Sequence, residues 1–124
     1  MAVSASAQLQ IDFVTIGNSG NANHSSGIGS VSYDYAIGKY EVTVNQYVSF
    51  LNSVAGSSDA YGLYNSGGMG SGQFATIART GNEGAYSYSA IPAYGNRPIN
   101  FVSWFNAARF SNWLHNGANS NGLS

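Results

Sequence analysis

The chain has 124 residues, a size typical of one domain, and 44% of them are hydrophobic, which is enough for a buried core. Charged residues make up only 7%, against about 25% in an average soluble protein. The net charge of -1 argues against nucleic acid as a partner, because phosphate backbones attract basic surfaces. The chain has no cysteine, which excludes disulfides, thiolate metal sites and cysteine nucleophiles within it. No apolar run approaches the ~20 residues of a membrane span, so we expect none.

Residues 1–10 carry a weak export signal. The triplet Ala5-Ser6-Ala7 before Gln8 has the small-residue form of a signal-peptidase site, although no charged region and no apolar region precede it. Residues 1–10 are therefore either a signal-peptide remnant or an ordinary flexible tail. We expect an extracytoplasmic bacterial protein, periplasmic or secreted, because the surface is rich in Asn, Ser and Tyr.

The first half of the chain predicts two strands and a long loop. Residues 11–16 (IDFVTI) form a short β-rich run, and residues 17–28 are a polar loop. From residue 29 onward, alternate positions are apolar (Val31, Tyr33, Tyr35 and Ile37). This period of two predicts a half-buried strand that ends in a turn at Gly38.

A helix over residues 43–55 follows. Thr43 and Gln46 have the spacing of a capping box, in which each side chain bonds the other residue's backbone. Behind the cap, an apolar stripe has helical spacing (Tyr47, Phe50, Leu51 and Val54). We expect Gly56 to end the helix in the left-handed conformation.

Residues 57–95 predict a long irregular excursion. Such a connection is uncommon unless it carries function or is packed by its own side chains. Residues 74–79 and 85–89 are candidate strands. We expect the tyrosines of this segment to pack it or to form a binding surface (Tyr61, Tyr64, Tyr86, Tyr88 and Tyr94).

A second helix is predicted from Ser103, which serves as its N-cap with Asn106 at the third helical position, to residues 115–117. Its apolar residues cover more than one face (Trp104, Ala107, Ala108, Phe110, Trp113 and Leu114). We therefore expect this helix to be buried on most sides.

No residue pattern points clearly to catalysis or to a metal. The glycine cluster at residues 66–72 (SGGMGSG) lacks the GK[ST] ending of a phosphate loop, which favours a flexible turn. His24 and His115 lack the spacing of metal ligands, and the end of a helix favours a histidine by its dipole. Glu41 is a candidate carboxylate, and a structural role beside Arg97 or Arg109 is favoured over catalysis. The sequence predicts no catalytic, cofactor-binding or metal residue.

Two segments resemble a known family. Residues 38–52 (GKYEVTVNQYVSFLN) resemble the Tyr-Glu-Val-Thr-Asn opening of the first helix in the formylglycine-generating enzyme, or sulfatase-modifying-factor, family, with Val44 at the asparagine position. Residues 97–117 (RPINFVSWFNAARFSNWLHNG) resemble its Pro-Val-x-x-Val-Ser-Trp-x-x-Ala helix. The resemblance covers residues 13–117 and is loose over residues 57–95.

The resemblance implies an α+β, C-type-lectin-like fold with two helices, a small antiparallel sheet and long irregular loops. In catalytic members it implies oxidation of a sulfatase cysteine to formylglycine by a copper-binding cysteine pair, together with calcium sites. The cysteine pair and the Leu-Pro-Thr-Glu-x-Glu-Trp segment of the family are not found in this sequence. No catalytic residue can be transferred to it.

We therefore expect residues 11–124 to be the N-terminal part of one such domain, an incomplete fold without its catalytic half. In this case Trp104, Phe110 and Trp113 would be partly uncovered. Three functions remain open: an exported member of an enzyme family, a non-catalytic lectin-like module that binds a ligand or displays a surface, and an inert extracellular structural domain. The partner would be a protein or a small molecule, with no cofactor in this chain.

Overall fold

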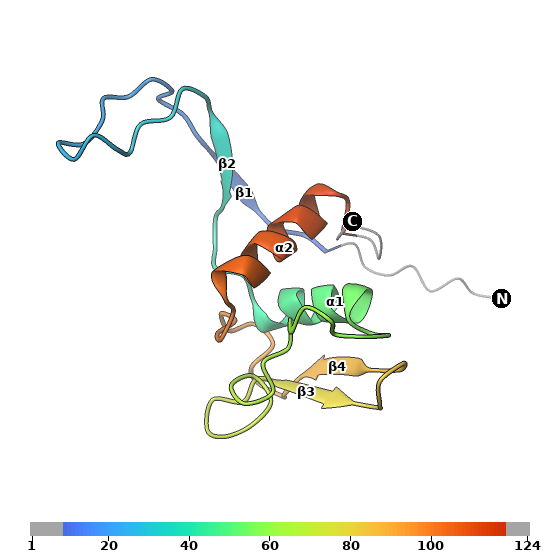
Figure 1. Ribbon diagram of the computed structural model, residues 1–124. Helices are drawn as coiled ribbons and strands as arrows, with labels where there is room; N and C mark the ends of the chain where they lie inside the picture. The colour runs from blue at the N-terminus through green and yellow to red at the C-terminus, as the bar shows by residue number, and fades with distance from the viewer. Residues whose placement is uncertain (1–8, 119–124) are drawn as a thin grey trace. The chain divides into compact units, whose positions relative to one another are not determined.

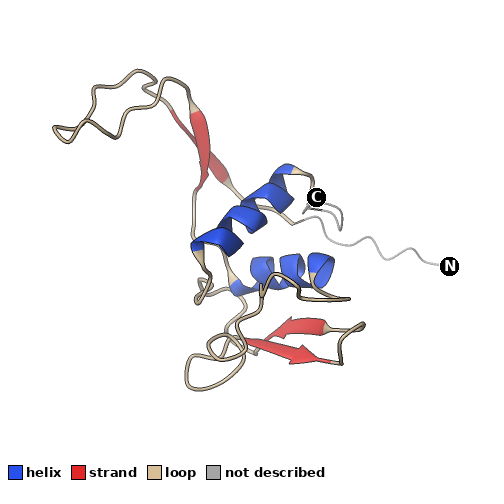
Figure 2. Cartoon of the chain, viewed as in Figure 1, coloured by secondary structure: helices blue, strands red, loops and turns tan. Residues whose placement is uncertain are grey.

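The computed structural model describes residues 9–118, and the triplet Ala5-Ser6-Ala7 lies outside them. The described chain contains two helices and four short strands (Figures 1 and 2). In chain order the elements are β1 (Phe13–Ile16), β2 (Tyr35–Gly38), α1 (Val44–Val54), β3 (Ile77–Thr80), β4 (Ser87–Ala90) and α2 (Trp104–His115). The predicted α+β composition is confirmed, but the strands form two separate two-stranded sheets where one was expected.

Residues 10–41 form a small unit of their own. Here β1 pairs with β2 in antiparallel register from Phe13 opposite Gly38 to Ile16 opposite Tyr35. The prediction of a half-buried strand over residues 29–37 is wrong, because only Tyr35–Gly38 is a strand and Tyr33 and Ile37 are 64% and 51% exposed. A two-stranded ribbon has no second layer within its unit to cover either face, so alternation alone cannot bury these side chains.

In the larger unit, whose described residues are Leu9 and residues 42–118, α1 is the first helix. The predicted capping box is present, since the Gln46 N–H donates to Thr43 Oγ1 at 3.3 Å and the Thr43 N–H donates to Gln46 Oε1 at 2.8 Å. The predicted left-handed end at Gly56 is wrong. Gly56 does not have a positive φ, and its carbonyl instead accepts a 2.7 Å hydrogen bond from the Tyr86 N–H.

A hairpin formed by β3 and β4 packs against α1. Both candidate strands of the long excursion are confirmed with shifted ends, and they pair from Ile77 opposite Ala90 to Thr80 opposite Ser87. The Asn52 side chain joins α1 to β4 by donating to the Tyr88 carbonyl at 2.8 Å and accepting from the Tyr88 N–H at 2.9 Å. Hydrogen bonds between the Asn52 side chain and the β4 backbone therefore attach residues 57–95 to α1.

Aromatic side chains form the contact between α1 and α2. Phe50 lies 5.5 Å from Tyr47, 5.4 Å from Phe110 and 5.2 Å from Trp113, measured between ring centroids. The polar atoms in this cluster are paired, because the Tyr47 hydroxyl donates to the Leu63 carbonyl and Trp113 Nε1 donates to Ser53 Oγ. These rings and the residues around them make the core of the larger unit.

The expectation that α2 is buried on most sides is wrong. Asn106, Phe110 and Trp113 are buried along one face, whereas Trp104 at the start of the helix is 77% exposed. Of the three residues predicted to be partly uncovered, Trp104 is exposed, whereas Phe110 and Trp113 are buried. α1 and the loop that carries Gly62 cover one face of α2, and the side of the helix that carries Trp104 stays exposed.

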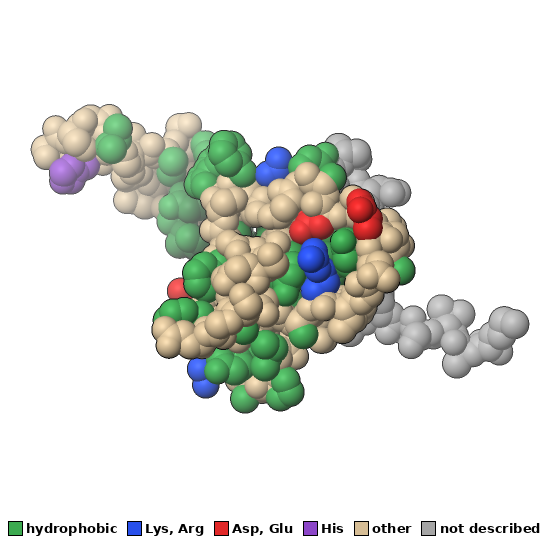
Figure 3. All heavy atoms as spheres, turned by 60° about the horizontal axis from the view of Figure 1, so that its bottom comes forward, with side chains coloured by type: hydrophobic (Ala, Val, Ile, Leu, Met, Phe, Trp, Pro, Cys, Tyr) green, Lys and Arg blue, Asp and Glu red, His purple; other side chains and the backbone are tan. Residues whose placement is uncertain are grey.

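Arginine side chains in this unit stack on tyrosine rings in cation–π contacts. The Arg79 guanidinium lies 4.9 Å from the Tyr64 ring and 4.5 Å from the Tyr86 ring, and Arg97 lies 4.6 Å from Tyr94. Charged side chains are sparse on the face shown in Figure 3, where hydrophobic and uncharged polar groups cover most of the surface. Cation–π contacts of this kind contribute about 0.5–1 kcal/mol each when exposed.

We predict that Phe50→Ala lowers the free energy of unfolding by about 3–5 kcal/mol, because it opens a cavity in the centre of the aromatic cluster. Ser49→Ala, an exposed change one residue away on α1, is the control and is expected to stay within about 0.5 kcal/mol of the unmodified protein. Urea unfolding followed by circular dichroism measures both. Equal effects of the two changes would show that the cluster does not hold the unit together.

We also predict that Tyr47 makes stability fall in alkali. Burial, and secondarily the negative charge of Asp59, raise the pKa of Tyr47 above its ordinary value of 10.0. Above pH 10.0 the unfolded chain loses this proton while the folded chain keeps it, so the stabilisation is complete below this pH and falls by ~1.4 kcal/mol per pH unit above it. Urea unfolding of the unmodified protein and of Tyr47→Phe, compared from about pH 8 to 11, should show their difference changing with this slope. A constant difference would contradict the prediction.

Candidate functional site

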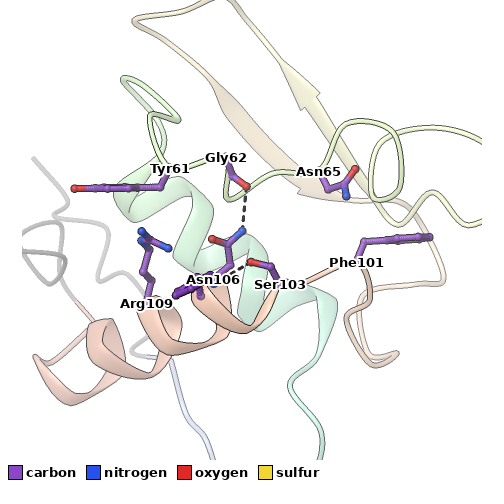
Figure 4. Close-up of a pocket in the computed structure, with 8 residues that line it drawn as sticks. Tyr61, Gly62, Asn65, Phe101, Ser103, Asn106 and Arg109 are labelled. Carbon is purple, nitrogen blue, oxygen red and sulfur yellow. Dashed lines mark hydrogen bonds between the residues drawn. The ribbon is translucent and has the colours of Figure 1, made fainter.

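An open cavity of about 500 Å³ lies beside the first turns of α2 in the larger unit (Figure 4). Its volume is within the range of small-molecule sites, roughly 300–1,000 Å³. The lining combines aromatic rings, amides, a hydroxyl and one cation. The residues are Tyr61, Gly62, Asn65, Phe101, Ser103, Phe105, Asn106 and Arg109.

The start of α2 fixes one wall of the cavity. Ser103 caps the helix, as predicted, by accepting the Asn106 N–H on its Oγ at 3.2 Å. The buried Asn106 side chain donates from Nδ2 to the Gly62 carbonyl at 3.0 Å, a bond drawn in Figure 4. This bond holds the loop that carries Tyr61 and Gly62 against the helix.

Side-chain oxygens shape the opposite wall. The Asp59 carboxylate accepts the backbone N–H groups of Leu63 at 2.7 Å and Tyr64 at 2.9 Å. Asn65 Oδ1 accepts the Gly68 N–H at 2.9 Å, so its amide nitrogen is the group left to meet a ligand. The wall is therefore held by bonds within the loop before any ligand arrives.

Aromatic rings border the opening. Phe101 and Phe105 are 46% and 68% exposed, and Tyr61 is also exposed. Phe101 has a φ of 58°, in the left-handed region that costs a bulky residue energy. Its ring lies over Gly68 and 6.4 Å from the Phe74 ring, measured between centroids. Strained backbone and exposed rings of this kind are typical of binding surfaces.

Arg109 carries the only charge among the residues that line the cavity. Its guanidinium lies 4.6 Å from the centre of the Tyr61 ring. Figure 4 shows the two side chains next to each other. The sequence favours a structural role for Glu41 beside Arg97 or Arg109. Glu41 is exposed at the end of the smaller unit, and both guanidinium groups face tyrosine rings within the larger unit. A planar guanidinium stacks well on an aromatic face, which makes this arrangement stable without a carboxylate.

The other residues considered from the sequence lie elsewhere. His24 Nδ1 is 3.1 Å from Ser26 Oγ in an exposed loop, and His115 lies in the last turn of α2, as predicted. Over residues 9–118 the structure has no group of three or more His, Asp or Glu side chains that could hold a metal ion. The glycine cluster is not simply a flexible turn, because Met69 in its centre is fully buried and its carbonyl accepts the Thr76 and Ile77 N–H groups.

Sequence reasoning missed most of the cavity. Asn106 is predicted only as the third residue of the second helix, and Asn65, Phe101 and Phe105 have no predicted role in a site. The run Phe101, Trp104 and Phe105 did contain a signal, because three large apolar residues so close to a helix start cannot all point to one core. The pairing of this run with residues 61–65 is long-range and left no mark in the sequence.

We predict that Gly68→Ala removes the Phe101 ring from the cavity rim. A Cβ atom at Gly68 would lie 2.4 Å from Phe101 Cγ, closer than real contacts allow. Gly67→Ala is the matched control, because the nearest atom to its Cβ would be Asn65 Oδ1 at an ordinary 3.7 Å. Nuclear Overhauser contacts between the Phe74 and Phe101 rings should disappear in the first variant and persist in the second. Their persistence in both would show that Gly68 does not position the ring.

The comparison with known families identifies the chain. No curated protein and no solved structure matches it. The sequence model of the family described as "Sulfatase-modifying factor enzyme 1-like domain" matches residues 14–117. This match spans most of the chain and includes both helices and the cavity residues. The chain therefore belongs to the sulfatase-modifying factor enzyme 1-like domain family.

Proposed function

We propose that this chain acts as a non-catalytic ligand-binding module of the sulfatase-modifying factor enzyme 1-like family, in an extracytoplasmic protein. The observation that carries the proposal is the cavity at the start of α2, in which aromatic rings, amides and one guanidinium converge. Concave sites with a few directed polar groups among apolar walls are the usual form of small-molecule sites.

The oxidase chemistry that the family resemblance implies does not fit these residues. Copper would be held by a cysteine pair, and the chain has no cysteine. Calcium prefers several carboxylate and carbonyl oxygens, and no cluster of three acidic or histidine side chains exists among residues 9–118. We assign no reaction step to either metal here, and binding is the function that the side chains present can perform.

The cavity is built to receive a ligand without large rearrangement. The Asn106 bond to Gly62 and the Asp59 bonds to Leu63 and Tyr64 already order both walls. Walls ordered in advance reduce the entropy lost on binding. The exposed rings of Tyr61, Phe101 and Phe105 then provide apolar contact area with few rotatable bonds.

The proposal also includes the type of fold, the location and the partner. A C-type-lectin-like fold is supported by two helices, short antiparallel hairpins and long loops, and by the family match. An extracytoplasmic location is supported by a surface in which amides, hydroxyls and tyrosines replace charge. The partner is a small molecule or a protein. In the part of the chain that the structure describes, no helix has the length and apolar character to cross a membrane.

We predict that small molecules bind preferentially in this cavity. In a fragment screen of the ¹⁵N-labelled protein, amide shifts should change together at Gly62, Asn65 and Asn106. Phe105→Ala should weaken the hits about tenfold, because it removes one aromatic contact. Ser111→Ala, an exposed change on the same helix, is the control.

The same protein tests the catalytic alternative. Incubation with copper, a reductant and a cysteine-containing peptide should produce no aldehyde, because the protein itself has no thiol to hold the metal. Hits that cluster away from the cavity, or aldehyde formed in this incubation, would contradict the proposed function.

A further inference from the structure

The chemistry of the cavity points to a class of ligand. Arg109, in the second turn of α2, lines the cavity with one face of its guanidinium against the Tyr61 ring. Stacking uses the flat face and leaves the in-plane N–H groups free to donate hydrogen bonds. No ion pair with a carboxylate is found for Arg109 among residues 9–118, and Figure 4 shows its guanidinium next to the Asn106 amide.

Arg109 differs in position from the other stacked arginines. Arg79 lies between Tyr64 and Tyr86 on β3, and Arg97 lies on Tyr94 at the same 4.6 Å distance as Arg109 on Tyr61. Of these three, only Arg109 lines the cavity. Arginine stacking on tyrosine therefore occurs at several places in this protein. At Arg109 alone of the three, the in-plane N–H groups also face a cavity and can donate to a ligand there.

Donors and acceptors both surround Arg109. The Asn106 Oδ1 and the Gly62 carbonyl are acceptors, whereas Asn65 accepts the Gly68 N–H on its oxygen and keeps its amide nitrogen for donation. Ser103 Oγ accepts the Asn106 N–H and keeps its own O–H proton to donate. A cation with nearby donors and no acidic residue in the lining selects a ligand that carries acceptor oxygens and a negative charge.

We propose that the cavity binds a small organic carboxylate with a flat or cyclic apolar body. The carboxylate would pair with the in-plane N–H groups of Arg109, and the apolar body would lie against the exposed rings of Phe101 and Phe105. One cation matches the single charge of a carboxylate, whereas a phosphate dianion calls for more than one. This inference rests on the proposed function and names its ligand class.

The test compares benzoate with its neutral isostere benzamide, by amide-shift titration of the unmodified protein. Benzoate should shift Asn65, Ser103 and Asn106 and should bind about tenfold more tightly than benzamide, because only the carboxylate forms charge-assisted bonds. Raising the salt concentration from about 0.05 M to 0.5 M should weaken benzoate and leave benzamide unchanged.

Three variants separate the effect of the Arg109 charge from the effect of its packing. Arg109→Gln should weaken benzoate about tenfold and leave benzamide unaffected, while Arg97→Gln, which removes an equivalent stack outside the cavity, should change neither. Arg109→Lys keeps the charge without the planar fork and should give an intermediate loss. The amide spectrum of each variant verifies its fold, and the benzoate–benzamide comparison in the unmodified protein stands even if a variant unfolds.

The outcomes distinguish the two proposals. Equal binding of benzoate and benzamide in the cavity, unaffected by salt or by Arg109→Gln, would overturn the carboxylate inference and leave the binding function intact. Fragment hits in the cavity without any benzoate binding would overturn the inference in the same way. No binding of any small molecule in the cavity would overturn both the carboxylate inference and the proposed binding function of this cavity.

Discussion

The packing of α1 against α2 through aromatic rings is the constraint on which the larger unit depends. Phe50 from α1 contacts Phe110 and Trp113 from α2, and these side chains are almost fully buried. Because residues three and four apart share a helix face, the burial of Phe110 and Trp113 also brings Asn106 to the same side. There the Asn106 amide reaches the Gly62 carbonyl. The position of the loop over the cavity therefore follows from the core.

The same helix phase places the ligand-facing groups. Phe105 and Arg109 are four residues apart, so they lie together on the neighbouring face, at the border between core and solvent. Neither is buried in the core, and both line the cavity. A site at this border combines rigid support from the helix with access for a ligand. No additional helix or strand is needed to form the site.

Amides and tyrosines perform the tasks that ion pairs perform in more highly charged proteins. Asn52 joins a helix to a strand edge, Asn106 joins a helix to a loop, and Arg79 lies between two tyrosine rings. Bonds from a side-chain amide to the backbone are directional and insensitive to salt, unlike exposed ion pairs. This use of neutral groups explains how a chain with 7% charged residues orders a long irregular excursion.

Local signals in the sequence determined the helices and their starts. The capping residues Thr43 and Ser103 act over three residues, and the stripe that contains Tyr47, Phe50 and Leu51 needs only helical spacing, so both helices could be predicted, as could the existence of β3 and β4. The family also followed from local motifs.

Only the tertiary structure decided which faces are covered and where the cavity lies. The alternation over residues 29–37 and the apolar residues of α2 indicated burial, yet the ribbon and Trp104 remain exposed, because burial requires a partner surface that periodicity does not specify. The cavity lies between residues 61–65 and residues 101–109. These two segments are connected by the hydrogen bond from the Asn106 side chain to the Gly62 carbonyl and by the stacking of Arg109 on Tyr61. Contacts so distant along the chain depend on how the helices pack, and no local pattern encodes them.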